Sequence, residues 1–164
     1  MATLHEKQSL TGLRAWDNLT DNLFVGTWKL ISCDAYRRNG QVLPIYGPNP
    51  DGRLFYDAAG NMSVHLMRAD RPNFRAAEKF RATDEEMRAA YQGYEAYFST
   101  YKVDWERGLI NHRVLGGLFP NWTGSLQPRY FRFEGNDRLV LSTEPLEAQP
   151  QNRTVVRLVW ARLS

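Results

Sequence analysis

The chain has 164 residues, a net charge of +3 at pH 7 and one cysteine, Cys33. This length suits a single domain with its own hydrophobic core, so neither a disulfide nor a structural metal is needed to stabilise it. The basic residues are scattered rather than concentrated, which argues against a nucleic-acid-binding protein. The apolar strand pattern around Cys33 favours a buried, inert thiol over a nucleophile.

The N-terminal part of the chain does not look like a targeting segment. Charged side chains interrupt the first 25 residues, at Glu6, Lys7, Arg14, Asp17 and Asp21, which leaves no apolar core for a signal peptide. No stretch approaches the roughly 20 apolar residues of a membrane span. The sequence therefore predicts a cytoplasmic protein without a membrane segment. Residues 1–20 are interpreted as an extension, and residues 21–164 as one domain.

Short strands separated by turn residues are predicted from Val25 onwards. The first strand covers residues 25–33, and alternation places Trp28, Leu30 and Ser32 on one face. Asn39-Gly40 is a strong hairpin signal, and residues 47–52, rich in proline and glycine, are predicted to form a loop. Two further strands, separated by a turn, are predicted over residues 53–56 and 62–67.

One helix is predicted, and it begins near Thr83. Thr83 and Glu86 form a capping box, in which each side chain satisfies a free amide of the first turn. Apolar residues then recur at spacings of three and four and form one stripe, which consists of Met87, Ala90, Tyr91 and Tyr94. Gly93 weakens the helix by about 1 kcal/mol relative to alanine, so the helix is expected to end near Ala96.

Strand patterns return after the helix, over residues 97–103, 109–115, 123–133, 138–142 and 154–163. The chain thus contains about eight or nine strands. Sheets with so many strands close into barrels or pack as sandwiches, because exposed edges promote aggregation. A single helix cannot build a parallel α/β sheet, and it is expected to cover or plug one end of a barrel.

Several segments resemble the microbial lipocalin-like domain family. Gly26-Thr27-Trp28 resembles the Gly-x-Trp opening of lipocalins, and the other similar segments are residues 52–56, 60–66, 68–72, 97–101 and 120–124. The resemblance implies an all-β fold, a closed antiparallel calycin-type barrel. It also implies that Trp28 packs at the closed end under a basic residue of the last strand, either Arg162 or Arg157.

The chain departs from that family pattern at two positions. Ser99 stands where glycine is expected, and Pro128 interrupts a strand that usually continues with an apolar residue. Because proline cannot donate to a strand ladder, Pro128 predicts an edge or a bulge. The family resemblance implies little about chemistry, since fold does not decide function. Some family members occur among enzymes of natural-product biosynthesis.

Two histidines lie in the middle of predicted strands. If the apolar face of Ile110, His112 and Val114 points inward, His112 can exchange a proton with a bound molecule. The alternative is a hydrogen-bonded structural histidine. His65 lies on a strand whose inner face alternation does not identify. Either the two histidines share a cavity and divide acid and base roles, or one is buried and the other lies at the surface.

Arg129 is the third candidate catalytic residue. An inward Arg129 would bind a carboxylate through its planar fork of donors, whereas an outward one would be solvated. Seven other side chains are candidates for ligand binding, although aromatic residues equally serve to fill a core. They are Trp28, Tyr46, Tyr56, Tyr97, Tyr101, Trp122 and Gln127.

These observations predict that the barrel binds a small, largely apolar organic molecule. The leading hypothesis is a cofactor-independent isomerase, cyclase or lyase, with a place in natural-product biosynthesis, that acts by orientation and proton transfer. The alternatives are a non-catalytic carrier or sensor, and a barrel filled by its own side chains. Metal-ligand spacing and phosphate-binding loops are absent from the sequence, so no metal or cofactor is predicted. A monomer or a homodimer is expected.

Overall fold

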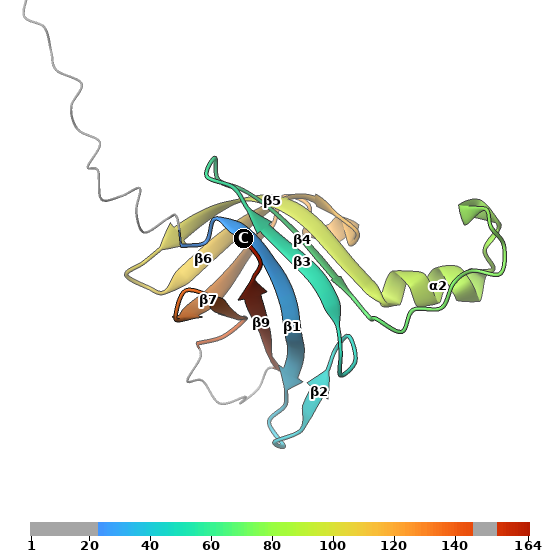
Figure 1. The fold of residues 1–164 in the computed structure, drawn as a ribbon, viewed down its shortest axis with the longest axis horizontal. Coiled ribbons are helices and arrows are strands. Elements are labelled where there is room, and N and C mark those ends of the chain that lie inside the picture. Colours follow the sequence, from blue (N-terminus) through green and yellow to red (C-terminus); the bar gives the residue numbers. More distant parts are fainter. Residues whose placement is uncertain (1–22, 146–153) are drawn as a thin grey trace, which may run out of the picture.

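A computed structural model describes residues 23–145 and 154–164, and within them nine antiparallel strands form one continuous sheet (Figure 1). The extension predicted for residues 1–20 lies outside the described residues. The strands are β1 (Gly26–Tyr36), β2 (Val42–Pro44), β3 (Asp51–Tyr56), β4 (Asn61–Met67), β5 (Tyr94–Asp104), β6 (Leu109–Gly117), β7 (Leu126–Glu134), β8 (Arg138–Ser142) and β9 (Val155–Arg162). The helical elements are α2 (Asp84–Gln92) and two short 3-10 turns, η1 (Lys79–Arg81) and η2 (Pro120–Trp122).

The sheet closes because its first long strand pairs with its last. β1 pairs with β9 from Trp28↔Arg162 to Tyr36↔Val155, while its other edge pairs with β3 and, at its end, with β2. Closure leaves no long unpaired edge, the feature that makes open sheets aggregate. The predicted all-β fold is therefore confirmed as a closed antiparallel barrel of eight strands, with β2 as an additional strand.

Alternation along each strand separates the inside of the barrel from the outside. On β4, Met62, Val64 and Leu66 are buried, whereas His65 is exposed. On β1 the alternation is interrupted, since the register shifts between Leu30 and Ser32. This irregularity moves the buried position from Ser32, which was predicted to share the face of Trp28, to Cys33.

Trp28 and Arg162 close one end of the barrel. The fully buried Trp28 donates from Nε1 to the carbonyl of Phe24 over 2.9 Å. The Arg162 guanidinium lies 4.0 Å from the centre of the indole ring and donates to the carbonyls of Val25 and Asn136. Of the two basic residues that the family resemblance implied, Arg162 therefore covers Trp28, while Arg157 stacks on Tyr36.

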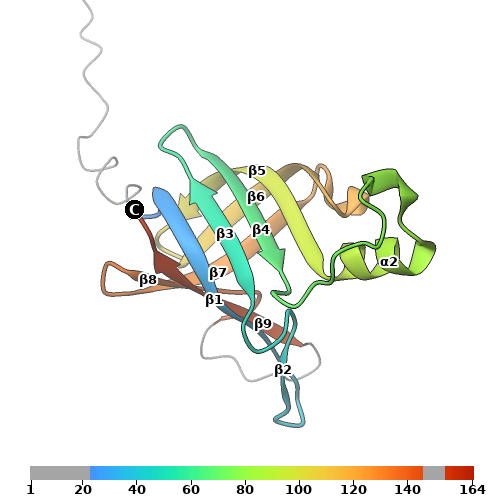
Figure 2. The ribbon, with the colours of Figure 1, turned by 45° about the vertical axis from the view of Figure 1, so that its right-hand side comes forward.

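The helix differs from its prediction in length and in position. Its capping box at Thr83 and Glu86 is confirmed, but it ends at Gln92 rather than near Ala96. The reason is that Tyr94 already pairs with Met67 as the first residue of β5, so strand pairing prevails over helical periodicity. No residue of α2 is buried, and the helix projects away from the barrel (Figures 1 and 2). It does not plug the barrel. Among the described residues, no helix has the length and apolar character required to span a membrane.

The edge predicted at Pro128 is found in the first half of β7. There β7 pairs with β6 from Leu126 to Tyr130, but its pairing with β8 begins only at Tyr130. Among the described residues, Pro128 therefore pairs with no strand on its other side and interrupts no ladder there. β8 ends at Ser142, the partner of Tyr130, so the first half of β7 extends beyond it, and Pro128 and its neighbours Gln127 and Arg129 line the cavity there.

Candidate functional site

The barrel encloses a cavity of about 530 Å³, within the range of roughly 300–1,000 Å³ that is typical of small-molecule sites. Its walls are mainly apolar side chains from the inner faces of the strands, including Leu54, Met62, Val64, Leu66, Leu141 and Leu158. The hypothesis of a barrel filled by its own side chains is therefore wrong. The interior is suited to holding a small organic ligand.

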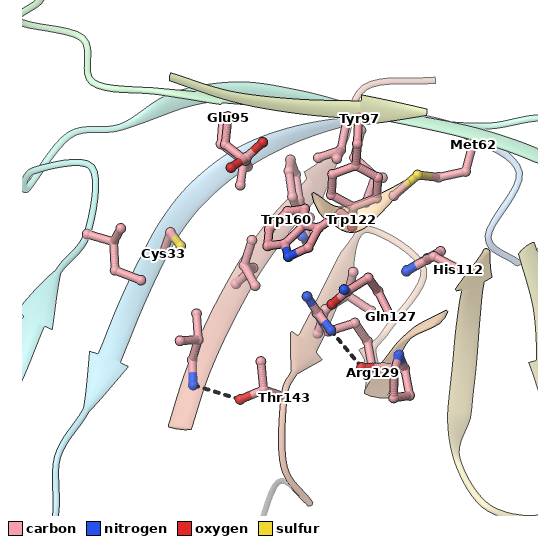
Figure 3. A pocket seen from close by; sticks show the side chains of 18 of the residues that line it. Cys33, Met62, Glu95, Tyr97, His112, Trp122, Gln127, Arg129, Thr143 and Trp160 are labelled. Atoms are coloured by element: carbon pink, nitrogen blue, oxygen red, sulfur yellow. Dashed lines mark hydrogen bonds between the residues drawn. The ribbon is translucent and has the colours of Figure 1, made fainter. Parts of the chain in front are cut away.

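Aromatic side chains form one side of the cavity (Figure 3). The ring of Tyr97, on β5, meets that of Trp122, in η2, edge to face at a centroid distance of 5.7 Å. Trp160, on β9, is almost completely buried and lines the same space. The rings of Tyr97, Trp122 and Trp160 give this side of the cavity apolar surface on which an aromatic ligand can pack.

His112 lies at the inner wall of the cavity and is held by Tyr56. The two side chains are buried, and Tyr56 Oη lies 2.8 Å from His112 Nε2. Burial, with a smaller contribution from the charge of Arg129, lowers the pKa of His112 to about 3, against a weak opposite effect of the Gln127 backbone. Burial also raises the pKa of Tyr56 well above its usual value. The pair is therefore neutral at physiological pH.

The hydrogen bonds of Tyr56 and His112 indicate which atoms of the pair carry the protons. If Tyr56 donates to Nε2, the imidazole proton lies on Nδ1, which makes no hydrogen bond of good geometry among the described residues, although the Gln127 backbone lies close enough to affect the ring. In the opposite arrangement both the phenolic hydrogen and Nδ1 would lack partners. Because each unsatisfied buried group costs about 1–3 kcal/mol, we assign the first arrangement. His112 then presents an N–H donor rather than a base.

Trp160 contributes a second buried donor, since its Nε1 also has no hydrogen-bond partner within the described part of the chain. Buried polar groups are nearly always paired in folded proteins, so each exception calls for an explanation such as a ligand or a water molecule. Both exceptions lie in the wall of one cavity, so an acceptor placed there, from a ligand or from a water molecule, would pair with them.

Charged and polar side chains lie on two sides of the cavity (Figure 3). On β7, Arg129 Nη1 donates to the carbonyl of Pro128 over 2.7 Å, and Gln127 Nε2 donates to Ser125 Oγ over 3.1 Å. Across the space stands Glu95, whose pKa is raised by burial.

Two further ionisable groups of the cavity hold their protons. Burial raises the pKa of the Cys33 thiol to about 12, with smaller effects of Asp34 and Arg129. Burial, assisted by Cys33 and Glu95, also raises the pKa of Tyr46. The thiol is thus the inert, buried group predicted for Cys33. In the described residues no group of three or more His, Cys, Asp or Glu side chains could hold a metal ion.

The structure brings six of the ten predicted site residues to the cavity wall, namely Tyr46, Tyr97, His112, Trp122, Gln127 and Arg129. Tyr56 stands behind His112 and contacts it. The prediction is corrected for His65, whose exposed ring lies outside the barrel with Nδ1 2.7 Å from Tyr94 Oη. The two histidines therefore do not share a cavity.

Trp28 and Tyr101 are also corrected. Trp28 fills the closed end and does not line the cavity. Tyr101 donates from its hydroxyl to the carbonyl of Asp57 over 2.8 Å, beyond the cavity wall. Both residues have structural contacts that explain their presence.

Sequence reasoning missed Glu95 and Trp160 as cavity residues. Glu95 was assigned to the helix, although its place on β5 follows once Gly93 is taken as the helix end. Trp160 could have been found, because Val156, Leu158 and Trp160 are alternate residues of one strand and all line the cavity.

Comparison with known proteins agrees with this architecture. A family model described as a lipocalin-like domain matches residues 25–163. A curated protein from Aspergillus oryzae, 4'-hydroxy-3'-methoxypropiophenone carrier protein, is 34% identical over 88 residues, which represent 50% of this chain and 78% of that protein.

Proposed function

Because the chain belongs to the lipocalin-like domain family, we propose that it binds a small, largely apolar aromatic molecule inside its barrel and carries it. The observation that supports this most strongly is the cavity itself, about 530 Å³ in volume and lined by Tyr97, Trp122 and Trp160. Since the wall is mainly apolar and its polar groups are few, most of the affinity would come from burial of the ligand's rings.

The relative from Aspergillus oryzae supports a carrier of this kind. Its name states that it carries a substituted aryl ketone, a flat molecule with an apolar ring and several oxygen acceptors. A molecule of that shape suits a cavity that has an aromatic side and buried N–H donors. We therefore propose substituted aryl ketones as first ligands to test, and a role in natural-product biosynthesis.

Titration calorimetry with 4'-hydroxy-3'-methoxypropiophenone tests the carrier proposal. We expect binding of one molecule per chain, and a loss of about tenfold in affinity on Tyr97→Leu, because an aromatic contact contributes about 0.5–1.5 kcal/mol beyond its area. Phe98→Leu is the matched control, since Phe98 is adjacent on β5 but 54% exposed, against 9% for Tyr97. Equal losses in both variants would place the ligand elsewhere.

A second candidate function is catalysis by proton transfer, and the Tyr56–His112 pair favours it. Tyr56 holds His112 so that an imidazole N–H lies beside the ligand cavity, where it can polarise a carbonyl or give a proton to a reacting group, a contribution worth roughly 10²–10⁴-fold in rate. A cofactor-independent isomerase, cyclase or lyase would use the pair in this way. Since His112 is neutral and donates from Nδ1 in our assignment, its role would be that of an acid or a polarising donor.

Mass spectrometry of the ligand after long incubation separates the two candidates. If the protein is an enzyme, the molecule is converted, and Tyr56→Phe and His112→Gln each slow the conversion by at least about tenfold. His65→Gln is the control, because its ring lies outside the barrel. If the bound molecule is released unchanged, the catalytic function is contradicted and the carrier function remains.

A further inference from the structure

We propose that the aromatic ligand bears an oxyanion, either a carboxylate or an acidic phenolate, and that Arg129 binds it. This inference rests on the proposed function and specifies which ligands the cavity selects. It is carried by the contacts of Arg129, by the charges around it and by the donors that share its wall.

Most N–H donors of the Arg129 guanidinium make no hydrogen bond to the described residues. Arg129 is half-buried in the cavity wall, and its side chain makes one hydrogen bond to the described residues, from Nη1 to the carbonyl of Pro128. A guanidinium has five N–H donors in a planar fork. The ion pairs found among the described residues involve other arginines, including Arg132 with Glu134 on the outer face of the same strand. Within residues 23–145 and 154–164, Arg129 therefore lines the cavity as a cation without a carboxylate partner.

The positive charge of Arg129 acts on the interior rather than on solvent alone. It lowers the pKa values of Cys33, Tyr56 and Tyr97, opposing the larger effect of burial, which raises them. It also lowers the pKa of His112, in the same direction as the larger effect of burial. These four residues come from four different strands around the barrel. An anion placed among them would meet the field of Arg129 in a site of low polarity, where charge interactions are strong.

Among the described residues, neither acidic side chain of the cavity forms an ion pair with Arg129. Glu95 and Glu144 both line the space, but neither lies within 4.0 Å of the Arg129 guanidinium. Figure 3 shows Glu95 on the opposite side of the space from Arg129. Burial raises the pKa of Glu95 and so disfavours its ionised form. The oxyanion is thus attracted to the β7 side and away from Glu95.

The neighbours of Arg129 supply matching donors. Figure 3 shows Gln127, Arg129 and His112 directed toward the same space, with Trp160 beside it. Gln127 offers its side-chain amide, while His112 Nδ1 and Trp160 Nε1 are buried atoms without partners in the described residues. His112 Nδ1, Trp160 Nε1 and the Arg129 guanidinium are thus N–H donors that a ligand's acceptor oxygens can reach. Charge-assisted hydrogen bonds to an oxyanion are the strongest form of that match.

Binding of two pairs of shape-matched probes, followed by tryptophan fluorescence, tests this inference. The first pair is 2-naphthoate and methyl 2-naphthoate, and the second is 4-nitrophenolate and 4-nitroanisole. We expect each anion to bind roughly ten- to a hundredfold more tightly than its neutral partner, as for hydrogen bonds to charged groups. A preference within only one pair identifies the oxyanion as a carboxylate or as a phenolate.

Variants at two arginines of β7 separate a local effect from net charge. Arg129→Gln should abolish the preference for the anion, while Arg129→Lys should keep part of it. Arg132→Gln removes the same charge from the outer face and should change neither affinity. If Arg129→Gln does not fold, the inference is still tested by the ratio of anion to neutral affinity, measured on the natural chain and on Arg129→Lys.

The outcomes distinguish the two proposals. Equal binding of anion and neutral partner overturns the assignment to Arg129 but leaves the carrier function standing. A preference that persists in Arg129→Gln also overturns it. If no probe and no aryl ketone binds at all, the proposed function fails and the inference fails with it.

Discussion

Lowering the pH from about 6.5 to 4.5 should reduce the free energy of unfolding by about 2 kcal/mol through His112 alone. The folded-state pKa of His112 is depressed to about 3, from an ordinary value of 6.5. Between these values the unfolded chain binds one proton more than the folded chain, so stability increases with pH. The contribution is fully present above pH 6.5 and is lost as the pH falls.

Other titrating groups affect the same measurement in known directions. Glu95 has a raised pKa, so it acts in the opposite sense and stabilises the fold as the pH falls towards its ordinary value of 4.5. The carboxylates with lowered pKa values act in the same direction as His112, because the unfolded chain takes up protons near their ordinary values of 3.8 and 4.5. They therefore contribute only near the lower limit of this pH range and below it; they are Asp51, Asp57, Asp70 and Glu86.

Urea denaturation at a series of pH values, on the natural chain and on His112→Gln, isolates the contribution of His112. The difference between the two pH slopes is the measured quantity, because the substitution also removes the bond to Tyr56. A His112→Gln variant with an unchanged slope would contradict the burial of a neutral imidazole.

Replacing Trp28 by alanine should cost about 3–5 kcal/mol of stability, the range found when large aromatic side chains are removed from cores. Trp28 is 0% exposed, its Nε1 donates to Phe24, and its ring lies under Arg162. The substitution removes all these contacts at once at the point where β1 meets β9. Guanidinium denaturation of the variant and the natural chain measures the loss.

The matched control for Trp28→Ala is Trp122→Ala at the cavity. Trp122 is half-buried and packs against Tyr97 and Phe119 through edge-to-face contacts. Its removal should cost about 1–2 kcal/mol, less than that of Trp28. Equal losses would show that the closed end does not stabilise the barrel in the way described.

The turns and the closed end could be predicted from the sequence because each depends on local chemistry. The Asn39-Gly40 hairpin and the capping box at Thr83 need only neighbouring residues, and both are found. The place of Trp28 followed from a family resemblance rather than from pattern, and the structure supplies its partner, Arg162.

The inner face of each strand could not be predicted, because alternation defines two faces without saying which is buried. For this reason His65 and His112 were equal candidates, although only His112 is buried. The register shift on β1 reversed the faces at Ser32 and Cys33, and sequence alternation carries no sign of it. Likewise, Tyr94 was predicted to lie in the helix, but it is the first residue of β5 because it pairs with Met67.

The indole N–H signals of the tryptophans test the central claim most directly. The chain has five tryptophans, and in an ¹⁵N-correlated NMR spectrum each gives one indole signal, to be assigned by single Trp→Phe substitutions. When an aromatic ligand is added, the signals of Trp160 and Trp122 should shift, because both residues line the cavity. The signal of Trp28, bonded to Phe24 at the closed end, should stay in place. A ligand that binds without moving the Trp160 signal would contradict a guest inside the barrel.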